Sequence, residues 1–201
     1  MAAPASDTYR TIAAPAQGIY KEKGSKFIGL AYPVTTEEEI KAIYGQLKKE
    51  YFDARHHCYA FMLGAGGLRY RANDDGEPNH SAGDPILGQI RSAGLTNVLV
   101  VVIRYFGGIK LGVSGLIQAY REAAGEALAA AQTVERVETT TLSLAFDYGQ
   151  MNAVMSVVKD FKLEVKKQDF ALSCCLVVAV RRNLADQVLE KLAGISTATP
   201  L

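Results

Sequence analysis

The sequence predicts an α+β protein with two domains, and three observations lead to that prediction. Short apolar runs typical of strands alternate with stretches whose apolar residues recur at helical spacing. The pattern resets near Thr133 to Val137, so a domain boundary is expected at residue 136. Residues 137–201 then follow the order strand, helix, strand, strand, helix, which is typical of a small ferredoxin-like sandwich. A chain of 201 residues suits one large domain or two small ones.

In the first expected domain, residues 1–136, strands are predicted where apolar runs lie between turn signals. Gly24 and Ser25 form such a signal, and the glycines from Gly64 to Gly67 predict a hairpin. The expected strands are 9–14, a run just before Gly24, 27–34, 58–63, 68–71 and 97–106. The last of these is continuously apolar, so we expect it to be buried on both faces.

Three helices are expected in the same domain. Thr36, with Glu39 three residues later, fits a capping box at the start of the first. A short second helix is expected to begin near Asp84, because Pro85 suits the first helical position. The third helix is expected over residues 113–131, and its many alanines predict a close approach to the sheet beneath.

The second expected domain, residues 137–201, carries shorter elements. The strands are expected at 139–146, 163–170 and 171–180, with a further one at 195–199, and the helices at 150–161 and 184–192. This order is that of a ferredoxin-like α+β sandwich.

Composition excludes several classes of protein. Lys and Arg number 22 against 21 Asp and Glu, a net charge of +1, which argues against a protein that is basic all over. No apolar run is long enough for a membrane helix, and the N-terminus does not resemble a signal peptide. The cysteines are Cys58, Cys174 and Cys175, without the spacing of a zinc site or a disulfide framework. We therefore expect a cytoplasmic protein that does not contact membranes.

The most informative stretch runs from the end of the apolar strand into the alanine-rich helix. Glycines let backbone N–H groups approach a ligand, and a helix start favours anions. We therefore interpret this stretch as an anion-binding turn. Its residues are Arg104, Tyr105, Gly107, Gly108, Lys110 and Gly112, and Lys26 belongs to the basic residues that lie among tyrosines elsewhere in the domain. The alternative is a tight connection whose glycines serve packing alone, beside an ordinary mixed surface.

A second unusual stretch is acidic and rich in turn formers. Asp74, Asp75 and Glu77 can hold a hard cation through oxygen ligands or supply a general acid and base. We expect this stretch and the anion-binding turn to face each other across one cleft, and we assign His57 and Ser81 to the acidic side of it. The alternative is a solvated turn whose Asp side chains bond their own backbone.

Three stretches together resemble the YigZ/IMPACT family. They are His56-His-Cys-Tyr-Ala-Phe, Asp74-Asp-Gly-Glu-Pro with Ser81-Ala-Gly-Asp-Pro-Ile-Leu, and Arg104-Tyr-Phe-Gly-Gly-Ile-Lys-Leu-Gly. The resemblance covers residues 16–131, and the tail fits the bacterial two-domain form. His80 departs from the family pattern, which usually has Gly there.

The resemblance implies more than the spacing does. It implies a βαβ-type first domain with a left-handed crossover, as in a ribosomal-protein domain and elongation factor G domain IV. It also implies that residues 137–201 resemble the last domain of elongation factor G. Eukaryotic relatives regulate translation initiation through a partner that controls a kinase. They do so with a further N-terminal domain that this chain is expected to lack, so that role is not transferred.

We therefore expect a non-enzymatic, translation-linked protein that contacts RNA or the ribosome. Arg104 and Lys110 would contact phosphate, and the acidic residues would line the same cleft. The alternative is a metal-assisted enzyme that acts on a phosphorylated small molecule, with a divalent cation on the acidic stretch as its only cofactor. A protein-interaction module in residues 137–201 is a third reading, and exposed sheet edges suggest a homodimer.

Overall fold

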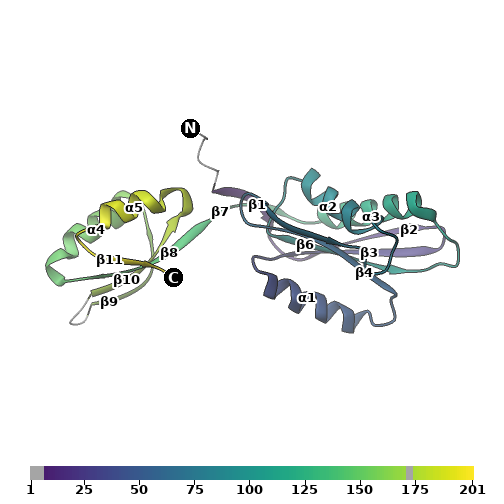
Figure 1. Ribbon diagram of the computed structural model, residues 1–201, viewed down its shortest axis with the longest axis horizontal. Coiled ribbons are helices and arrows are strands. Elements are labelled where there is room, and N and C mark those ends of the chain that lie inside the picture. Colours follow the sequence, from purple (N-terminus) through teal and green to yellow (C-terminus); the bar gives the residue numbers. More distant parts are fainter. Residues whose placement is uncertain (1–6, 171–173) are drawn as a thin grey trace. The chain divides into compact units, whose positions relative to one another are not determined.

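The computed structural model describes residues 7–170 and 174–201. The chain divides into two compact units between Arg136 and Val137, with Asp7 belonging to the second unit (Figure 1). We call Thr8–Arg136 the N-terminal unit and Val137–Leu201 the C-terminal unit. None of the helices in the described ranges has the length and apolar character that a membrane crossing requires.

The N-terminal unit is built on a five-stranded antiparallel sheet in the order β2-β3-β6-β4-β5. Its strands are β2 (Ala16–Glu22), β3 (Ser25–Pro33), β4 (His56–Leu63), β5 (Arg69–Asn73) and β6 (Val98–Tyr105). Its helices are α1 (Glu37–Glu50), α2 (Gly83–Ser92) and α3 (Gly112–Ala129). Because β3 and β4 both pair antiparallel with β6, they run parallel to each other, and α1 connects them as a βαβ unit. The left hand of this crossover stays a prediction.

Strand β6 is central and buried on both faces, as its continuous apolar run predicted. One face of the sheet packs with α1 in a cluster that includes Phe61, Leu99 and Ile103. The other face packs with α2 and α3 in a cluster that includes Phe27, Val100 and Tyr120. Consecutive residues of β6 therefore point into two different cores, and this alternation divides the candidate site.

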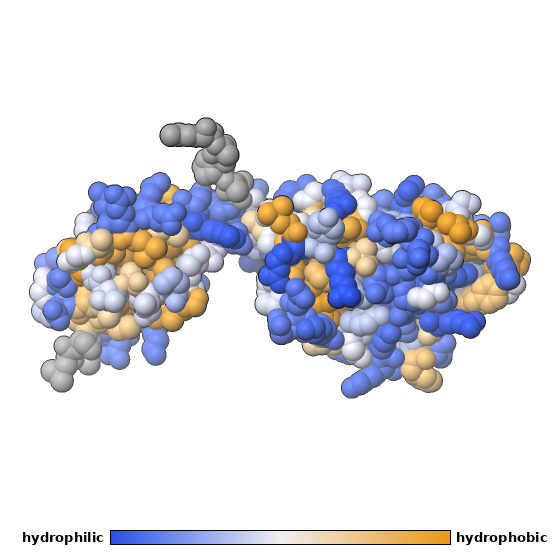
Figure 2. All heavy atoms as spheres, viewed as in Figure 1, coloured by the Kyte–Doolittle hydropathy of each residue, from blue (hydrophilic) through white to orange (hydrophobic). Residues whose placement is uncertain are grey.

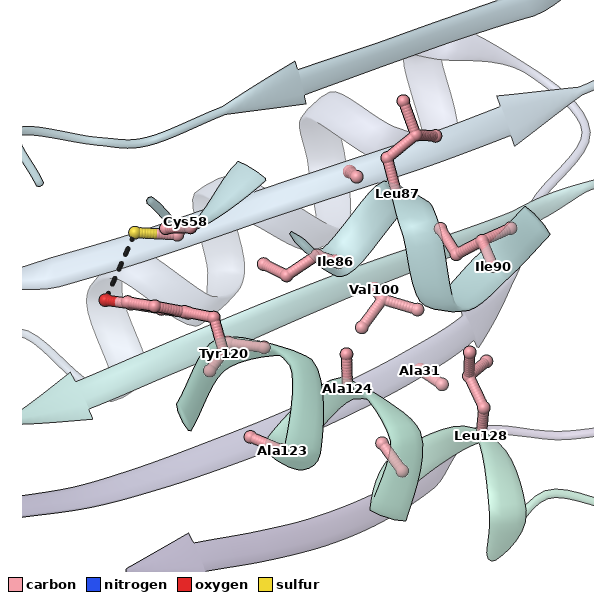
Figure 3. Close-up of a cluster of buried hydrophobic side chains, with 14 of the residues drawn as sticks. Ala31, Cys58, Ile86, Leu87, Ile90, Val100, Tyr120, Ala123, Ala124 and Leu128 are labelled. Atoms are coloured by element: carbon pink, nitrogen blue, oxygen red, sulfur yellow. Dashed lines mark hydrogen bonds between the residues drawn. The ribbon is translucent and has the colours of Figure 1, made fainter. Parts of the chain in front are cut away.

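Helix α3 lies very close to the sheet, in agreement with its alanine content. Ala124 and Leu128 extend toward Val100 and Ala31 (Figure 3), and Ala123 belongs to the same buried cluster. The sheet matches this with glycine, since a Cβ built on Gly29 would lie 2.1 Å from the carbonyl oxygen of Ala123. Small residues on both sides therefore allow the backbones to approach.

Local sequence signals mark some element boundaries and miss others. The capping box of Thr36 and Glu39 is present at the start of α1. Helix α2 begins at Gly83, one residue before the predicted start. Thr133–Val137 was not predicted as a strand, yet it forms β7 and pairs with β1 (Thr8–Ile12) in a separate two-stranded sheet. This short strand has its partner more than a hundred residues away, which no local pattern reveals.

The C-terminal unit is a four-stranded antiparallel sheet with helices on one side (Figure 1). Its elements are β8 (Thr139–Phe146), the 3₁₀ turn η1 (Tyr148–Gln150), α4 (Met151–Asp160), β9 (Glu164–Phe170), β10 (Cys174–Arg181), η2 (Arg182–Leu184), α5 (Ala185–Leu192) and β11 (Thr197–Pro200). The strand order β11-β8-β10-β9 and the βαββαβ chain order are those of the split βαβ sandwich. The predicted strand 171–180 is described from Cys174 onward, and its residues 171–173 lie outside the described residues.

Candidate functional site

One end of the N-terminal sheet gathers the stretches that the sequence singled out. Strand β6 ends at Tyr105, and its neighbours β3 and β4 begin at Ser25 and His56 at this same end of the sheet. Within the sheet, Arg104 lies opposite Phe27 on one side and His56 on the other. The β6–α3 loop (residues 106–111) and the acidic loop (residues 74–82) both extend from this end of the domain.

The two stretches meet in a buried ion pair. Nη1 of Arg104 lies 2.5 Å from Oε1 of Glu77, and the two side chains are only 9% and 4% exposed. The hydroxyl of Tyr120 donates to the same carboxylate oxygen at 2.8 Å. Cys58 extends the network, because its thiol lies 3.3 Å from the Tyr120 hydroxyl (Figure 3) and 2.9 Å from the carbonyl oxygen of Asp74. Arg104 and Glu77 are thus joined directly, not separated by an open cleft.

Burial shapes the chemistry of this network. It raises the pKa of the Cys58 thiol far above its ordinary value, so this cysteine is a neutral hydrogen-bonding group. It also raises the pKa of Tyr120, with Cys58 and Glu77 adding to the effect, which keeps the hydroxyl protonated as a donor. The network therefore fixes one end of the Arg104 guanidinium.

The rest of the Arg104 guanidinium is held by aromatic rings. Its Cζ lies 5.5 Å from the ring centre of Phe27 and 5.6 Å from that of Phe106, as in cation–π contacts. Phe27 is fully buried, whereas Phe106 is 55% exposed. Within the described residues, the buried Nε of Arg104 has no hydrogen-bond partner.

Tyr105 and Lys26 belong to the opposite face of the sheet. Tyr105 packs with the α1 core, and its hydroxyl donates to Asp53 at 2.8 Å. Burial and the Asp53 carboxylate raise the pKa of Tyr105 to about 12. Lys26 is the cross-strand partner of Tyr105, so it shares that face. The structure therefore separates these two residues from Arg104.

The glycine-rich β6–α3 loop is mostly exposed, and Gly107 ties it to the turn between β2 and β3. The backbone N–H of Gly107 donates to Oγ of Ser25 at 3.1 Å, and a Cβ on Gly107 would lie 1.9 Å from the carbonyl carbon of Gly24. Gly108 and Gly112 both have positive φ, 90° and 72°. Lys110 lies between them and is exposed. The residue before α3, Leu111, offers no side-chain cap, and the first turn of α3 has no acidic residue.

The acidic loop uses its carboxylates within the protein. Oδ1 of Asp74 accepts from the backbone N–H groups of Ala82 and Gly83, and its Oδ2 accepts from His80. Asp74 therefore caps α2, whose own N-cap residue, Ala82, has no side chain that can do so.

Asp75 is bound in the same way. Its Oδ2 accepts from the backbone N–H of His57 at 2.7 Å, and its Oδ1 pairs with Lys48 at 3.2 Å. Over residues 7–170 and 174–201, no three His, Cys, Asp or Glu side chains gather as a metal centre would need.

His57 and Ser81, the other two expected site residues, are both buried. His57 contacts the carbonyl oxygen of Tyr51 through Nε2 at 3.1 Å, and burial lowers its pKa. Ser81 donates to the carbonyl oxygen of Pro78 at 2.6 Å. The Ser81 side chain therefore fixes the backbone of the acidic loop, whereas the His57 ring contacts the C-cap residue of α1.

Sequence reasoning missed three participants in this network. Tyr120, Phe27 and Cys58 are absent from the predicted site residues. Tyr120 donates to Glu77, Phe27 packs against the Arg104 guanidinium, and Cys58 contacts the Tyr120 hydroxyl. A signal was present for Tyr120, since it is the single aromatic residue in α3. A hydroxyl on a fully buried face of an alanine-rich helix needs a hydrogen-bond partner.

Comparisons with known proteins agree with this arrangement of motifs. Residues 23–128, which include both loops, match the family model of the Impact N-terminal domain. An IMPACT family member of Haemophilus influenzae is 32% identical over 178 residues, which is 86% of each chain. The IMPACT family member YigZ of Escherichia coli is 32% identical over 186 residues, 92% of this chain and 91% of that one.

A solved structure agrees over both units. A crystal structure described as that of a hypothetical protein has a TM-score of 0.72 and 30% identity, covering 96% of this chain and 97% of the other. The resemblance drawn from the three sequence stretches is thus confirmed, and this chain belongs to the IMPACT family.

Proposed function

We propose that this protein is a translation-linked binding protein that contacts RNA or the ribosome through the β6–α3 end of its N-terminal unit. Family membership supports the link to translation, because the resemblance implies relatives that regulate translation initiation. The observation that carries the proposal is the loop between β6 and α3. It combines an exposed aromatic ring, Phe106, an exposed cation, Lys110, and a helix start without a side-chain cap.

These features suit a phosphate backbone and unstacked bases. Lysine neutralises phosphate, exposed aromatic rings stack on bases, and uncapped N–H groups at a helix start attract anions. The apolar side chains of Ile109 and Val113 are also exposed beside them. Hydrophilic residues cover most of the visible face of this unit, with hydrophobic ones interspersed (Figure 2). A discriminating contact fits a chain of net charge +1 better than general attraction to polyanions.

The enzyme alternative has less support. In that alternative the acidic loop binds the metal. The carboxylates of Asp74 and Asp75, however, accept hydrogen bonds from backbone N–H groups, and that of Glu77 accepts hydrogen bonds from Arg104 and Tyr120. These bonds build the loop and occupy oxygens that a cation would require.

The test is a titration of the full chain with a structured RNA at several salt concentrations. We expect binding that weakens as salt rises. Replacing Lys110 with Ala should weaken binding and reduce the salt slope by about one phosphate contact. Lys41→Ala is the matched control, since this exposed lysine lies near the start of α1, away from the loop. Affinity weaker than millimolar, or affinity that salt does not change, contradicts the proposal.

A further inference from the structure

The Arg104 guanidinium has one edge in use and one edge unused. Arginine offers an end pair of N–H groups and a side pair formed by Nε and Nη2. Glu77 binds Nη1, at the far side from Nε. Among the described residues, Nε has no partner and Nη2 makes no hydrogen bond. The unused edge is therefore the one that binds a carboxylate or a phosphate with two parallel hydrogen bonds.

The surroundings hold this edge in place. Glu77 accepts from the opposite end of the guanidinium and is itself held by the Tyr120 hydroxyl, and the rings of Phe27 and Phe106 flank the guanidinium. A buried donor without a partner costs free energy, on the order of 1–3 kcal/mol, unless a ligand satisfies it. Such a cost is acceptable at a binding position, since the arginine needs no rearrangement of its own when the ligand arrives.

The direction of approach is set by exposure. Phe27 is fully buried, so the ring that can move aside is Phe106, which is 55% exposed at the start of the β6–α3 loop. Six residues after Phe106 the chain enters α3, whose first turn has neither a side-chain cap nor an acidic residue. Fixed donors in a buried position beside such a helix start favour a dianionic ligand.

We infer that the side edge of Arg104 binds a phosphate monoester, the terminal phosphate of an RNA chain. This inference rests on the proposed function and names the part of the RNA that the site recognises. An internal phosphodiester carries a ribose on each side, so both arms would have to pass the rings that flank a guanidinium that is only 9% exposed. A terminal phosphate carries one ester arm and three free oxygens, so two oxygens reach Nε and Nη2 while the chain leaves past Phe106.

The test compares two synthetic RNAs of one single-stranded sequence, one with a 5′-phosphate and one with a 5′-hydroxyl, labelled at the 3′ end. We expect the full chain to bind the phosphorylated RNA about tenfold more tightly or better, as for a bidentate charged pair. Arg104→Lys keeps the charge beside Glu77 but removes the side edge, so it should abolish the preference. Arg55→Lys, at an exposed arginine, is the matched control.

Arg104 is buried, so its variant can lose stability, and a measurement on the unchanged protein covers that case. Inorganic phosphate should displace the phosphorylated RNA more strongly than chloride at equal ionic strength, and should displace the hydroxyl RNA no more than chloride does. Equal, salt-dependent binding of both RNAs overturns the inference and leaves the proposed function standing. Absence of binding to either RNA overturns both. If adenosine monophosphate binds as tightly as the 5′-phosphorylated RNA in a competition assay, the phosphate that the site recognises is that of a free nucleotide. That outcome overturns the assignment to an RNA end.

Discussion

Arg104 and Glu77 form an ion pair in which Nη1 lies 2.5 Å from Oε1 although the two side chains are 9% and 4% exposed. The pair joins β6 to the acidic loop, 27 residues earlier in the chain. Removing one partner of a buried pair leaves the other charge without compensation. The pair is therefore the point at which a single substitution disturbs both loops.

Glu77→Gln should lower the free energy of unfolding by about 3–5 kcal/mol, because it leaves the buried guanidinium without its anion. Tyr120→Phe removes only one hydrogen bond to that anion and should cost about 1–3 kcal/mol. Urea denaturation measures both values. Glu126→Gln, at an exposed residue of α3, is the control and should change little. A smaller loss for Glu77→Gln than for Tyr120→Phe would show that the pair does not carry the stability assigned to it.

Asp74→Ala should destabilise the protein through the start of α2. The substitution leaves the backbone N–H groups of Ala82, Gly83 and His80 without their acceptor, and a lost cap costs about 0.5–2 kcal/mol. Amide hydrogen exchange should show faster exchange at Ala82 and Gly83 than in the unchanged protein. Asp84→Ala, at an exposed residue of the same first turn, serves as the control. Equal exchange at these amides in both variants contradicts the capping role.

Gly107→Ala should displace the β6–α3 loop, because the new Cβ would lie 1.9 Å from a backbone carbon of Gly24. We expect a loss of stability together with weaker RNA binding. Gly45→Ala is a matched comparison in the interior of α1, where a Cβ meets nothing within 4 Å. That change should stabilise the protein by about 0.5–1 kcal/mol and leave binding unchanged. Thermal unfolding and the RNA titration measure the two effects, and unchanged binding by Gly107→Ala argues against the loop as the contact.

His57 predicts a dependence of stability on pH. Burial lowers its pKa, against the opposing influence of the Tyr51 carbonyl and Asp75. The unfolded chain returns His57 to about its ordinary value of 6.5, so below that pH the unfolded state binds more protons. The stabilising preference for the neutral ring is therefore present above pH 6.5 and is lost as the pH falls toward the lowered pKa.

The measurement compares the melting temperature at pH 7.5 and pH 5.5 for the unchanged protein and for His57→Gln. Glutamine keeps an amide donor for the Tyr51 carbonyl but does not titrate. The variant should lose less stability on acidification than the unchanged protein. The same loss in both proteins would assign the pH dependence to other groups.

The sequence was a good guide where the controlling interactions are local. The Thr36–Glu39 capping box spans three residues, and the burial of β6 follows from its own apolar run. Interactions between residues that lie far apart in the chain could not be predicted from such local patterns. Asp74 caps a helix that begins nine residues later, and no local rule links Arg104 to Glu77 or Tyr120.

One separation was within reach of the sequence. Arg104 and Tyr105 are consecutive in a strand, so their side chains must point to opposite faces. The interpretation of both as one binding surface joined residues that the sheet keeps apart, as the packing of Tyr105 with α1 shows. The burial of Arg104 could not be predicted in the same way, because it depends on α3 covering that face of the sheet.

The pairing of β1 with β7 has a consequence for anyone who wishes to isolate this module. The region that matches the family model, residues 23–128, excludes β1, β2 and β7. Yet β2 is an edge strand against α3, where Gly18 lies so close to Glu126 and Ala127 that no side chain fits between them. A fragment limited to residues 23–128 would expose the face of α3 that β2 covers. It would also lose the two-stranded sheet of β1 and β7, which joins the two ends of the unit. A fragment of residues 8–136 retains β2 and all of the β1–β7 pair except Val137.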